Sequence, residues 1–275
     1  MVGHEQHDPA ENHNNNHIFA IRINSFGGDT VVESSSVLHV TQQAFRATMN
    51  ALARPGRLQQ VPALAAPGFA NPHLAALAVT LLDSTCGFAV ASADDEAFSA
   101  AVGTQTYARP LGSGDFVEDV VGAATAATVA TASAAPAPTA VVPAAQLAQS
   151  DTSQLRSALP AALFALITRD AQKDAASRLI AAVPGGTPAS PERGATVLLE
   201  CDALATDVGD VASHRFVLEG PGINGQQCFA ASSSYWFFAR GARDDEFPCG
   251  IDILLLDPAG RLVGLPRSSR AILGA

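Results

Sequence analysis

Residues 247–270 read FPCGIDILLLDPAGRLVGLPRSSR, and this stretch predicts a buried β-hairpin. Its first half, 251–256, is apolar on both alternating faces except at Asp252, which is typical of a strand that is covered on both sides. The tetrapeptide Asp-Pro-Ala-Gly at 257–260 fits a type I turn, because proline presets the second position and glycine is favoured at the fourth. We therefore expect 261–265 to return as an antiparallel strand that stops at the following proline.

The carboxylate of Asp252 needs a partner in such a strand, because an unpaired buried carboxylate costs several kcal/mol. We count the register from a turn in which Asp257 faces Gly260. That register puts Asp252 opposite Leu265 and brings Arg267 diagonally onto the same face, within the ~7–8 Å that a long side chain spans. We expect a structural ion pair between Asp252 and Arg267, and a catalytic role for the carboxylate is the alternative.

The composition indicates a globular protein with a substantial core. The chain has 275 residues, of which 48% are hydrophobic, and its formal net charge is -10. This acidic balance argues against a nucleic acid partner, because proteins of that kind cluster Lys and Arg against phosphates. No uninterrupted apolar run is long enough to cross a bilayer, and the start lacks the pattern of a signal peptide. We expect a cytoplasmic protein with neither a nucleic acid nor a membrane as its partner.

The positions of the cysteines and the single lysine limit the metal-binding and covalent chemistry that the chain can perform. Cys86, Cys201, Cys228 and Cys249 are far apart and form no spacing suited to zinc, so we expect free, buried thiols and no metal site. Lys173 is the only lysine, which leaves one residue for any Schiff base.

The chain divides into a polar head and a patterned remainder. The start is rich in His and Asn, so we expect a flexible leader at 1–38 and a single folded domain at 39–275. The Ala-rich segment 122–149 predicts a short buried strand and a proline-broken connection. Elsewhere helical periods alternate with short apolar runs, which favours a layered α/β domain with a mixed sheet. We expect helices at 41–54, 71–83, 94–102 and 170–182 and within 226–240, and strands at 86–91, 162–168, 195–201 and 215–219.

One motif has the form G-x-G-x-x-G, because residues 220–225 read GPGING after an expected strand. A dinucleotide-binding fold uses such a loop with an acidic residue about twenty positions on, here Asp244 or Asp245. Pro221 removes a backbone N–H where phosphate would be held, so a structural turn is the other interpretation. A free-standing enzyme that uses this loop for a nucleotide or cofactor, or that holds PLP on Lys173, is the alternative function.

Four arginines are the best anion contacts that the sequence offers. Arg54 and Arg57 flank a Pro-Gly turn after the first expected helix, and Arg267 and Arg270 close the last hairpin. Arginine binds phosphate or phosphonate in a bidentate manner, so we predict a substrate-binding role for these four. Ion pairs with the many acidic residues explain them equally well.

Other groups give weaker indications. His73 and His214 could act as acid or base, although a surface or capping role explains each of them. Ser232–Ser234 lacks a G-x-S-x-G frame, which argues against nucleophilic hydrolysis. The aromatic run Tyr235–Phe238 could line a ligand cleft, belong to the core or form a subunit interface, and the last option predicts a homodimer. No catalytic residue is assigned.

Several short motifs follow one another between Val40 and Ala271 in a characteristic order. They are Phe45-Arg46 with Met49 and Ala51, Ala53-Arg54-Pro55-Gly56, Leu81-Leu82-Asp83, Pro191-Glu192-Arg193-Gly194-Ala195-Thr196, Gly220-Pro221-Gly222-Ile223, Phe247-Pro248-Cys249-Gly250-Ile251-Asp252 and Leu265-Pro266-Arg267-Ser268-Ser269. This ordered set resembles the PhnH family, whose members are subunits of the bacterial carbon-phosphorus lyase system. The leader and the 122–149 segment do not align with the family's pattern.

The resemblance implies a role in growth on organophosphonates together with PhnG, PhnI, PhnJ and PhnL. That system displaces adenine from ATP with a phosphonate and forms a ribose 1-phosphonate triphosphate. The family's fold, with a three-layer mixed sheet, resembles the large domain of PLP-dependent transferases without the cofactor, so no cofactor is expected. The resemblance implies an accessory subunit that has no established catalytic residues, with a nucleotide or a phosphonate as its small-molecule ligand.

Overall fold

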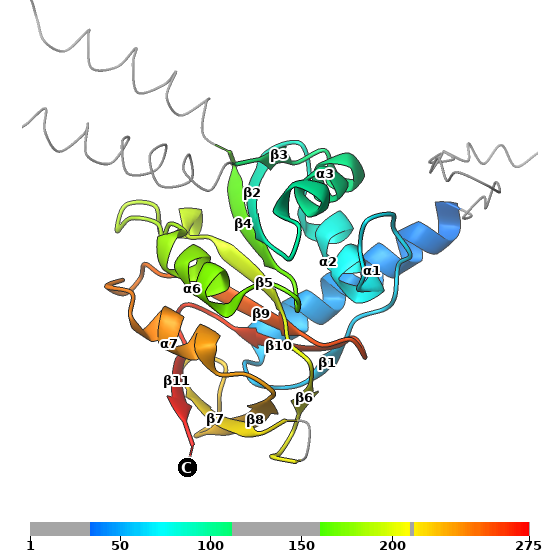
Figure 1. Ribbon diagram of the computed structural model, residues 1–275. Helices are drawn as coiled ribbons and strands as arrows, with labels where there is room; N and C mark the ends of the chain where they lie inside the picture. Colours follow the sequence, from blue (N-terminus) through cyan, green and yellow to red (C-terminus); the bar gives the residue numbers. More distant parts are fainter. Residues whose placement is uncertain (1–33, 112–159, 210–211, 275) are drawn as a thin grey trace, which may run out of the picture.

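The computed structural model describes residues 34–111, 160–209 and 212–274, which form two β-sheets with helices around them (Figure 1). The helices are α1 (Ser34–Ala53), α2 (Pro72–Leu81), α3 (Asp95–Thr106), α6 (Lys173–Ala182) and α7 (Tyr235–Gly241). The strands are β1 (Gln59–Gln60), β2 (Cys86–Ala91), β3 (Arg109–Pro110), β4 (Ala162–Ile167), β5 (Thr196–Glu200), β6 (Leu204–Ala205), β7 (His214–Glu219), β8 (Gln227–Ala231), β9 (Asp252–Leu256), β10 (Arg261–Leu265) and β11 (Arg270–Leu273). The expected α/β class is confirmed.

The larger sheet has seven strands in the order β1-β10-β9-β5-β4-β2-β3. Strands β9, β5, β4, β2 and β3 run parallel, whereas β10 and β1 are added antiparallel at one side. The sheet is therefore mixed, and the closing hairpin supplies its antiparallel part as expected. The central strands are apolar at nearly every position, as ALFALI in β4 illustrates, because both of their faces are covered.

Helices cover both faces of this sheet, which gives three layers (Figure 1). On one face, α1, α2 and α3 pack in a core with strand residues such as Phe88 and Leu254. On the other face, a second core contains Ile180 of α6 and Trp236 of α7. The smaller sheet, in the order β11-β7-β8-β6, contributes to this second core.

The sequence analysis predicts only one strand of the smaller sheet, the strand at 215–219. The segment 226–240 contains the expected helix, α7, but it begins with strand β8. Aromatic rings join β7 to both β8 and α7: the ring centroids of Phe216 in β7 and Trp236 in α7 lie 4.6 Å apart, and those of Phe216 and Phe229 in β8 lie 5.2 Å apart. Trp236 is fully buried, which confirms the core interpretation for this member of the aromatic run.

The hairpin at 251–265 forms as predicted, but its register differs by one residue. Leu265 pairs with Ile253 rather than with Asp252. The turn places three residues, rather than two, between the paired positions, and its last residue, Gly260, adopts a φ of 79°. A type I turn followed by a left-handed glycine is a common three-residue hairpin loop, and Asp-Pro-Ala-Gly is compatible with it.

Helix α1 begins at Ser34, before the expected start, because Val37 and Val40 already pack against the core. Residues 34–38, which were assigned to the leader, are therefore helical. The rest of the expected leader and the 122–149 segment lie outside the described residues. No helix in the described part of the chain has both the length and the apolar character needed to cross a membrane.

The backbones of α1 and β10 approach each other closely. Ala44, Ala47 and Ala51 are buried on the inner face of the helix. Gly264 of β10 lies beneath them, and a Cβ atom added there would stand 2.5 Å from the carbonyl oxygen of Ala51. Only glycine leaves room for this contact, so the sequence sets the distance between helix and sheet.

Candidate functional site

The structure brings together only two of the four arginines that were predicted as anion contacts. Arg267 lies in the turn between β10 and β11, Arg270 is the first residue of β11, and both line one pocket of about 380 Å³. Arg54 and Arg57 lie on the turn after α1, where both are exposed, and neither lines this pocket. This pocket therefore gathers only Arg267 and Arg270 of the four predicted arginines.

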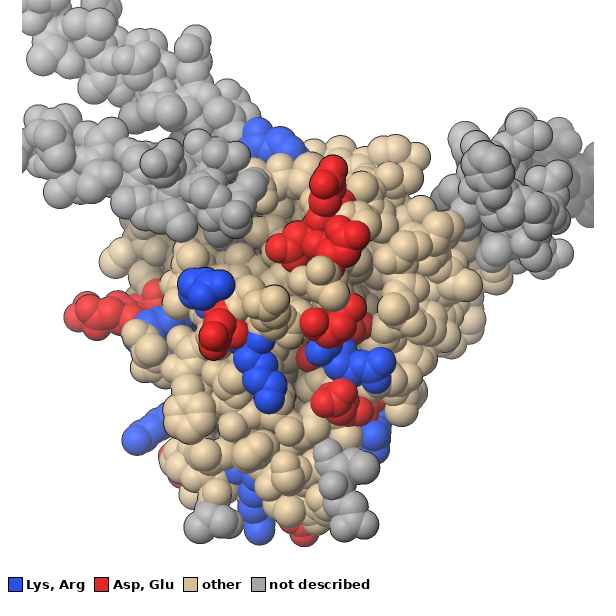
Figure 2. All heavy atoms as spheres, viewed as in Figure 1, with Lys and Arg blue, Asp and Glu red and all other residues tan. Residues whose placement is uncertain are grey.

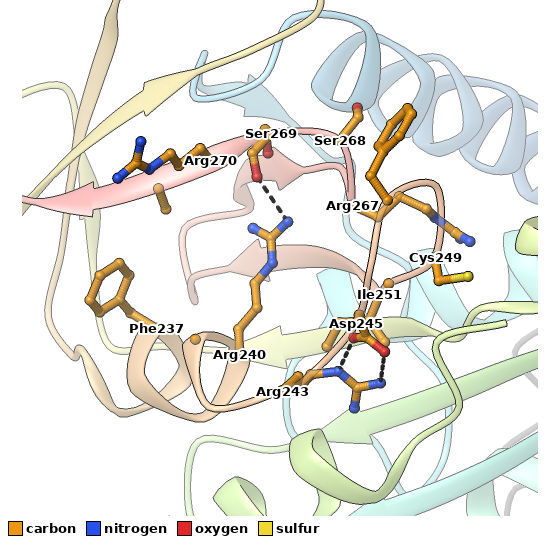
Figure 3. Close-up of a pocket in the computed structure, with 14 residues that line it drawn as sticks. Phe237, Arg240, Arg243, Asp245, Cys249, Ile251, Arg267, Ser268, Ser269 and Arg270 are labelled. Carbon is orange, nitrogen blue, oxygen red and sulfur yellow. Dashed lines mark hydrogen bonds and ion pairs between the residues drawn. The ribbon is translucent and has the colours of Figure 1, made fainter. Parts of the chain in front are cut away.

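The pocket lies between α7, the segment that precedes β9 and the turn that precedes β11 (Figure 3). Its charged lining consists of four arginines and one carboxylate, a local excess of positive charge in a chain of net charge -10. The sequence analysis did not select Arg240 or Arg243. Helical spacing could have found Arg240, because it follows Trp236 by one turn and shares its buried face. The lining residues are Phe237, Arg240, Gly241, Arg243, Asp245, Phe247, Cys249, Gly250, Ile251, Arg267, Ser268, Ser269, Arg270 and Ala271.

Arg267 forms the ion pair with Asp252 that the sequence predicts. Its Nη2 atom lies 2.6 Å from Oδ2 of Asp252, and its backbone N–H donates to Oδ1 at 2.7 Å. The guanidinium also donates to the carbonyl oxygens of Pro191 and Gly194. Because these acceptors occupy the guanidinium and the carboxylate accepts from Arg267, the pair joins the end of the sheet to the loop before β5 and has a structural role.

Arg240 is the arginine that points across the pocket. In Figure 3 its side chain extends from α7 toward the turn before β11, where Nη2 donates to the carbonyls of Pro266 at 2.7 Å and Ser269 at 3.2 Å. Its Nη1 atom is buried and has no hydrogen-bond partner. Burial lowers the pKa of the Arg240 guanidinium, although Asp252 nearby opposes this effect. A buried guanidinium with an unpaired N–H group can donate a charge-assisted hydrogen bond to an anion.

The other two arginines differ in how much of their charge is already neutralised. Arg243 lies 2.5 Å from the carboxylate of Asp245 and donates to the carbonyl of Ile180 at the end of α6. Arg270 is exposed on β11, and in Figure 3 its side chain points away from Arg243. Arg240 and Arg270 therefore remain available for an anion, whereas Arg243 supports the pocket wall.

The loop at 220–225 is a structural turn, and the dinucleotide interpretation is wrong. The loop joins the antiparallel strands β7 and β8, so no helix follows it to bind a pyrophosphate. Two of its glycines, Gly220 and Gly222, serve close packing instead. A Cβ added to Gly222 would stand 2.7 Å from the carbonyl oxygen of Ala53, and one added to Gly220 would stand 3.0 Å from that of Ser268. The motifs at 53–56, 220–223 and 265–269, which are distant in the sequence, thus meet at this loop.

The remaining candidates lie outside the arginine-lined pocket. Lys173 is exposed in the first turn of α6, an environment that does not suit a Schiff base. Nδ1 of His73 lies 2.9 Å from the carbonyl oxygen of Val61, a contact within the fold. His214 begins strand β7 at the rim of the smaller sheet. The hydroxyl of Ser232 accepts two backbone N–H groups and so stabilises a loop.

All four cysteines are free thiols, as expected. Cys86 and Cys201 are buried, whereas Cys228 and Cys249 are half-buried rather than buried as predicted. Burial raises the pKa of the Cys201 thiol, which makes this residue a poor nucleophile. Within the described residues, no group of three or more His, Cys, Asp or Glu side chains could hold a metal ion.

The fold and the pocket define an α/β protein with a three-layer mixed sheet and an arginine-lined cavity at the amino ends of its parallel strands. A family model described as bacterial phosphonate metabolism protein (PhnH) matches the sequence in two overlapping segments, residues 34–135 and 122–271. The chain therefore belongs to the PhnH family, as its ordered motifs indicated, and has a role in phosphonate metabolism. No curated protein matches the sequence.

Proposed function

We propose that this chain is a cytoplasmic subunit of the carbon-phosphorus lyase system and acts with PhnG, PhnI, PhnJ and PhnL. In that role it takes part in the transfer of a phosphonate to the ribose of ATP with release of adenine. Membership of the PhnH family, supported by the match over 34–135 and 122–271, is the observation that carries the proposal. We also propose that its three-layer fold is related to the large domain of PLP-dependent transferases, without PLP.

Within that system the arginine-lined pocket is proposed to hold an anionic group of the phosphonate or of the nucleotide. Phosphonate and phosphate oxygens accept hydrogen bonds from a guanidinium, and such charge-assisted bonds are about twice as strong as neutral ones. Arg240 supplies a buried donor without a partner, and Arg270 supplies a second cation at the rim. The pocket contributes binding and positioning, which suits an accessory subunit.

Removal of the vacant donor tests this assignment. Calorimetric titration of the full wild-type chain with methylphosphonate or ATP is expected to show saturable binding. The Arg240→Gln variant is expected to bind about 10–100-fold more weakly. The estimate follows from about 1.5–3 kcal/mol for a hydrogen bond to a charged group. Arg270→Ala, which removes no hydrogen bond within the fold, should weaken binding less, and Arg57→Ala, an exposed arginine outside the pocket, serves as the control. Equal affinities for Arg240→Gln and Arg57→Ala would contradict the assignment.

Co-purification tests the proposed partners. Helix α1 exposes Leu38, Phe45 and Met49 at 60%, 51% and 52%, and this spacing places them on one face. Such an apolar stripe is a suitable contact surface for another subunit. After co-expression with PhnG and PhnI, the wild-type chain is expected to elute with both, and the double variant F45E/M49E is expected to lose most of this association.

The matched control replaces Val208, a residue of equal exposure at 51% that lies outside α1, with Glu. Assembly of PhnG and PhnI without the chain, together with its separate elution, would argue against the proposed complex. If the F45E/M49E variant still elutes with PhnG and PhnI, the contact surface does not lie on this face of α1. Sedimentation of the isolated chain tests the homodimer that we also propose.

A further inference from the structure

The carboxyl ends of the parallel strands form a second edge with its own pocket. The chain leaves β2 through α3 toward β3, and it leaves β4 through α6 toward β5. Helices α3 and α6 lie on opposite faces of the sheet, so the two connections depart in opposite directions from adjacent strands. In open α/β sheets this arrangement is the topological switch point, and ligands bind in the crevice outside it.

A pocket of about 270 Å³ lies at this position. Its walls come from the residues that follow β2 and β4, from the start of α3 and from the last residue of β5. Leu74 and Phe98 contribute an apolar part of the lining. An adjoining pocket of about 120 Å³ shares Asn71, Arg169 and Glu200 with it. This space is smaller than a typical drug-sized site, so it suits a small ligand.

Glu200 is the side chain whose contacts are incomplete. It is only 8% exposed, although it carries a carboxyl group. Its Oε2 atom accepts the backbone N–H of Arg169 at 2.9 Å, whereas Oε1 is buried and has no hydrogen-bond partner. Burial raises the pKa of this carboxyl, and the Arg169 N–H and the Asn71 side chain lower it in part. A buried acceptor of this kind is destabilising unless a donor reaches it.

The charges around the pocket favour a cation. Asp94 and Asp170 line it together with Glu200, and Arg169 is the basic residue in its lining. That arginine already lies 3.7 Å from the carboxylate of Asp202. Figure 2 shows acidic side chains grouped on and below α3 on this face. An anion would meet an excess of carboxylates here, in contrast to the arginine-lined pocket.

We propose that this second pocket binds a small organic cation, a protonated primary amine on a short apolar body, whose ammonium group donates to Oε1 of Glu200. The apolar body packs against Leu74 and Phe98, and Asp94 and Asp170 attract the charge. Each part of this ligand thus matches a group that lines the pocket. The site is separate from the arginine-lined pocket and does not depend on the proposed function.

Calorimetric titration of the full chain with butylammonium tests the proposal, with butanol and butyrate as neutral and anionic probes of similar size. Saturable binding is expected for butylammonium, with at least tenfold weaker binding of butanol and butyrate. Glu200→Gln keeps the side-chain shape and an acceptor for the Arg169 N–H, and should bind butylammonium at least tenfold more weakly. Asp207→Asn, an exposed carboxylate outside the pocket, is the control and should bind as the wild type does.

A second variant keeps the result clear if Glu200→Gln fails to fold. Ala97→Phe fills the pocket from the first turn of α3 without altering Glu200, and it should abolish binding of butylammonium. No saturable binding of butylammonium to the wild type, equal binding of butanol or butyrate, or unchanged affinity in a folded Glu200→Gln would each overturn the proposal.

Discussion

Substitution of Gly264 by alanine is expected to remove about 3 kcal/mol from the free energy of unfolding. The new Cβ atom would stand 2.5 Å from the carbonyl oxygen of Ala51 and 2.6 Å from its carbonyl carbon. These are backbone atoms of α1, so no side chain can rotate to relieve the overlap and the helix must move away from β10. Overpacking of a core typically costs about 1–3 kcal/mol, and a backbone shift places this case at the upper end. Since such domains are stable by about 5–15 kcal/mol, the loss is a large share of the total.

Urea denaturation of the full chain measures this effect, and Gly103→Ala provides the matched control. Gly103 lies within α3, and its added Cβ would meet nothing closer than 3.7 Å. Alanine is favoured over glycine in a helix by about 0.5–1 kcal/mol, so the control variant should be more stable than the wild type. Similar stability for both variants would show that α1 and β10 are not packed backbone to backbone.

Asp252→Ala is expected to destabilise the protein by about 2–3 kcal/mol. The substitution leaves the Arg267 guanidinium, whose side chain is only 17% exposed, without its carboxylate and frees the Arg267 backbone N–H that Oδ1 accepts. Breaking a buried pair by removal of one partner costs about 3–5 kcal/mol, and the partial exposure of both side chains reduces this figure. Thermal and urea unfolding of the full chain give the measurement.

A double-mutant cycle distinguishes loss of the pair from loss of side-chain packing. Arg267→Met in the Asp252→Ala background should recover part of the stability, because no unpaired charge then remains, and the coupling energy should exceed about 1 kcal/mol. The exposed pair Arg169–Asp202 serves as the comparison, with side chains 55% and 73% exposed. A surface pair of this kind should couple by about 0–1 kcal/mol. Equal coupling in the two cycles would contradict the structural role of Asp252.

The sequence determines the closing hairpin well, because its strands are apolar on both faces and its turn has favoured residues. The one-residue error in register has a physical cause. Asp-Pro-Ala-Gly accommodates a loop of two or three residues, and the left-handed φ of Gly260 decides between them. The ion pair survives the error because the guanidinium of Arg267 is long enough to reach Asp252 in either register.

Several of the elements that the sequence analysis does not predict are too short to show a local pattern. Strands β1, β3 and β6 contain two residues each, too few for any period. The arginine-lined pocket is formed by the segments around Arg240 and Arg267. These segments are separated in the sequence and come together only in the folded structure. Prediction from residue type therefore selected Arg54 and Arg57 as readily as Arg270, although only the last lines the pocket.

The two pockets open at opposite ends of one set of strands, with guanidinium groups at one end and carboxyl groups at the other. Strand β5, which runs between these ends, has five residues and is roughly 16 Å long at about 3.3 Å per residue. The sheet thus separates positive from negative charge along its strand direction and forms a local electric dipole. A zwitterion whose two charges are only a few bonds apart is too short to reach both pockets. It could therefore place only its anionic group in the arginine-lined pocket or only its cationic group beside Glu200.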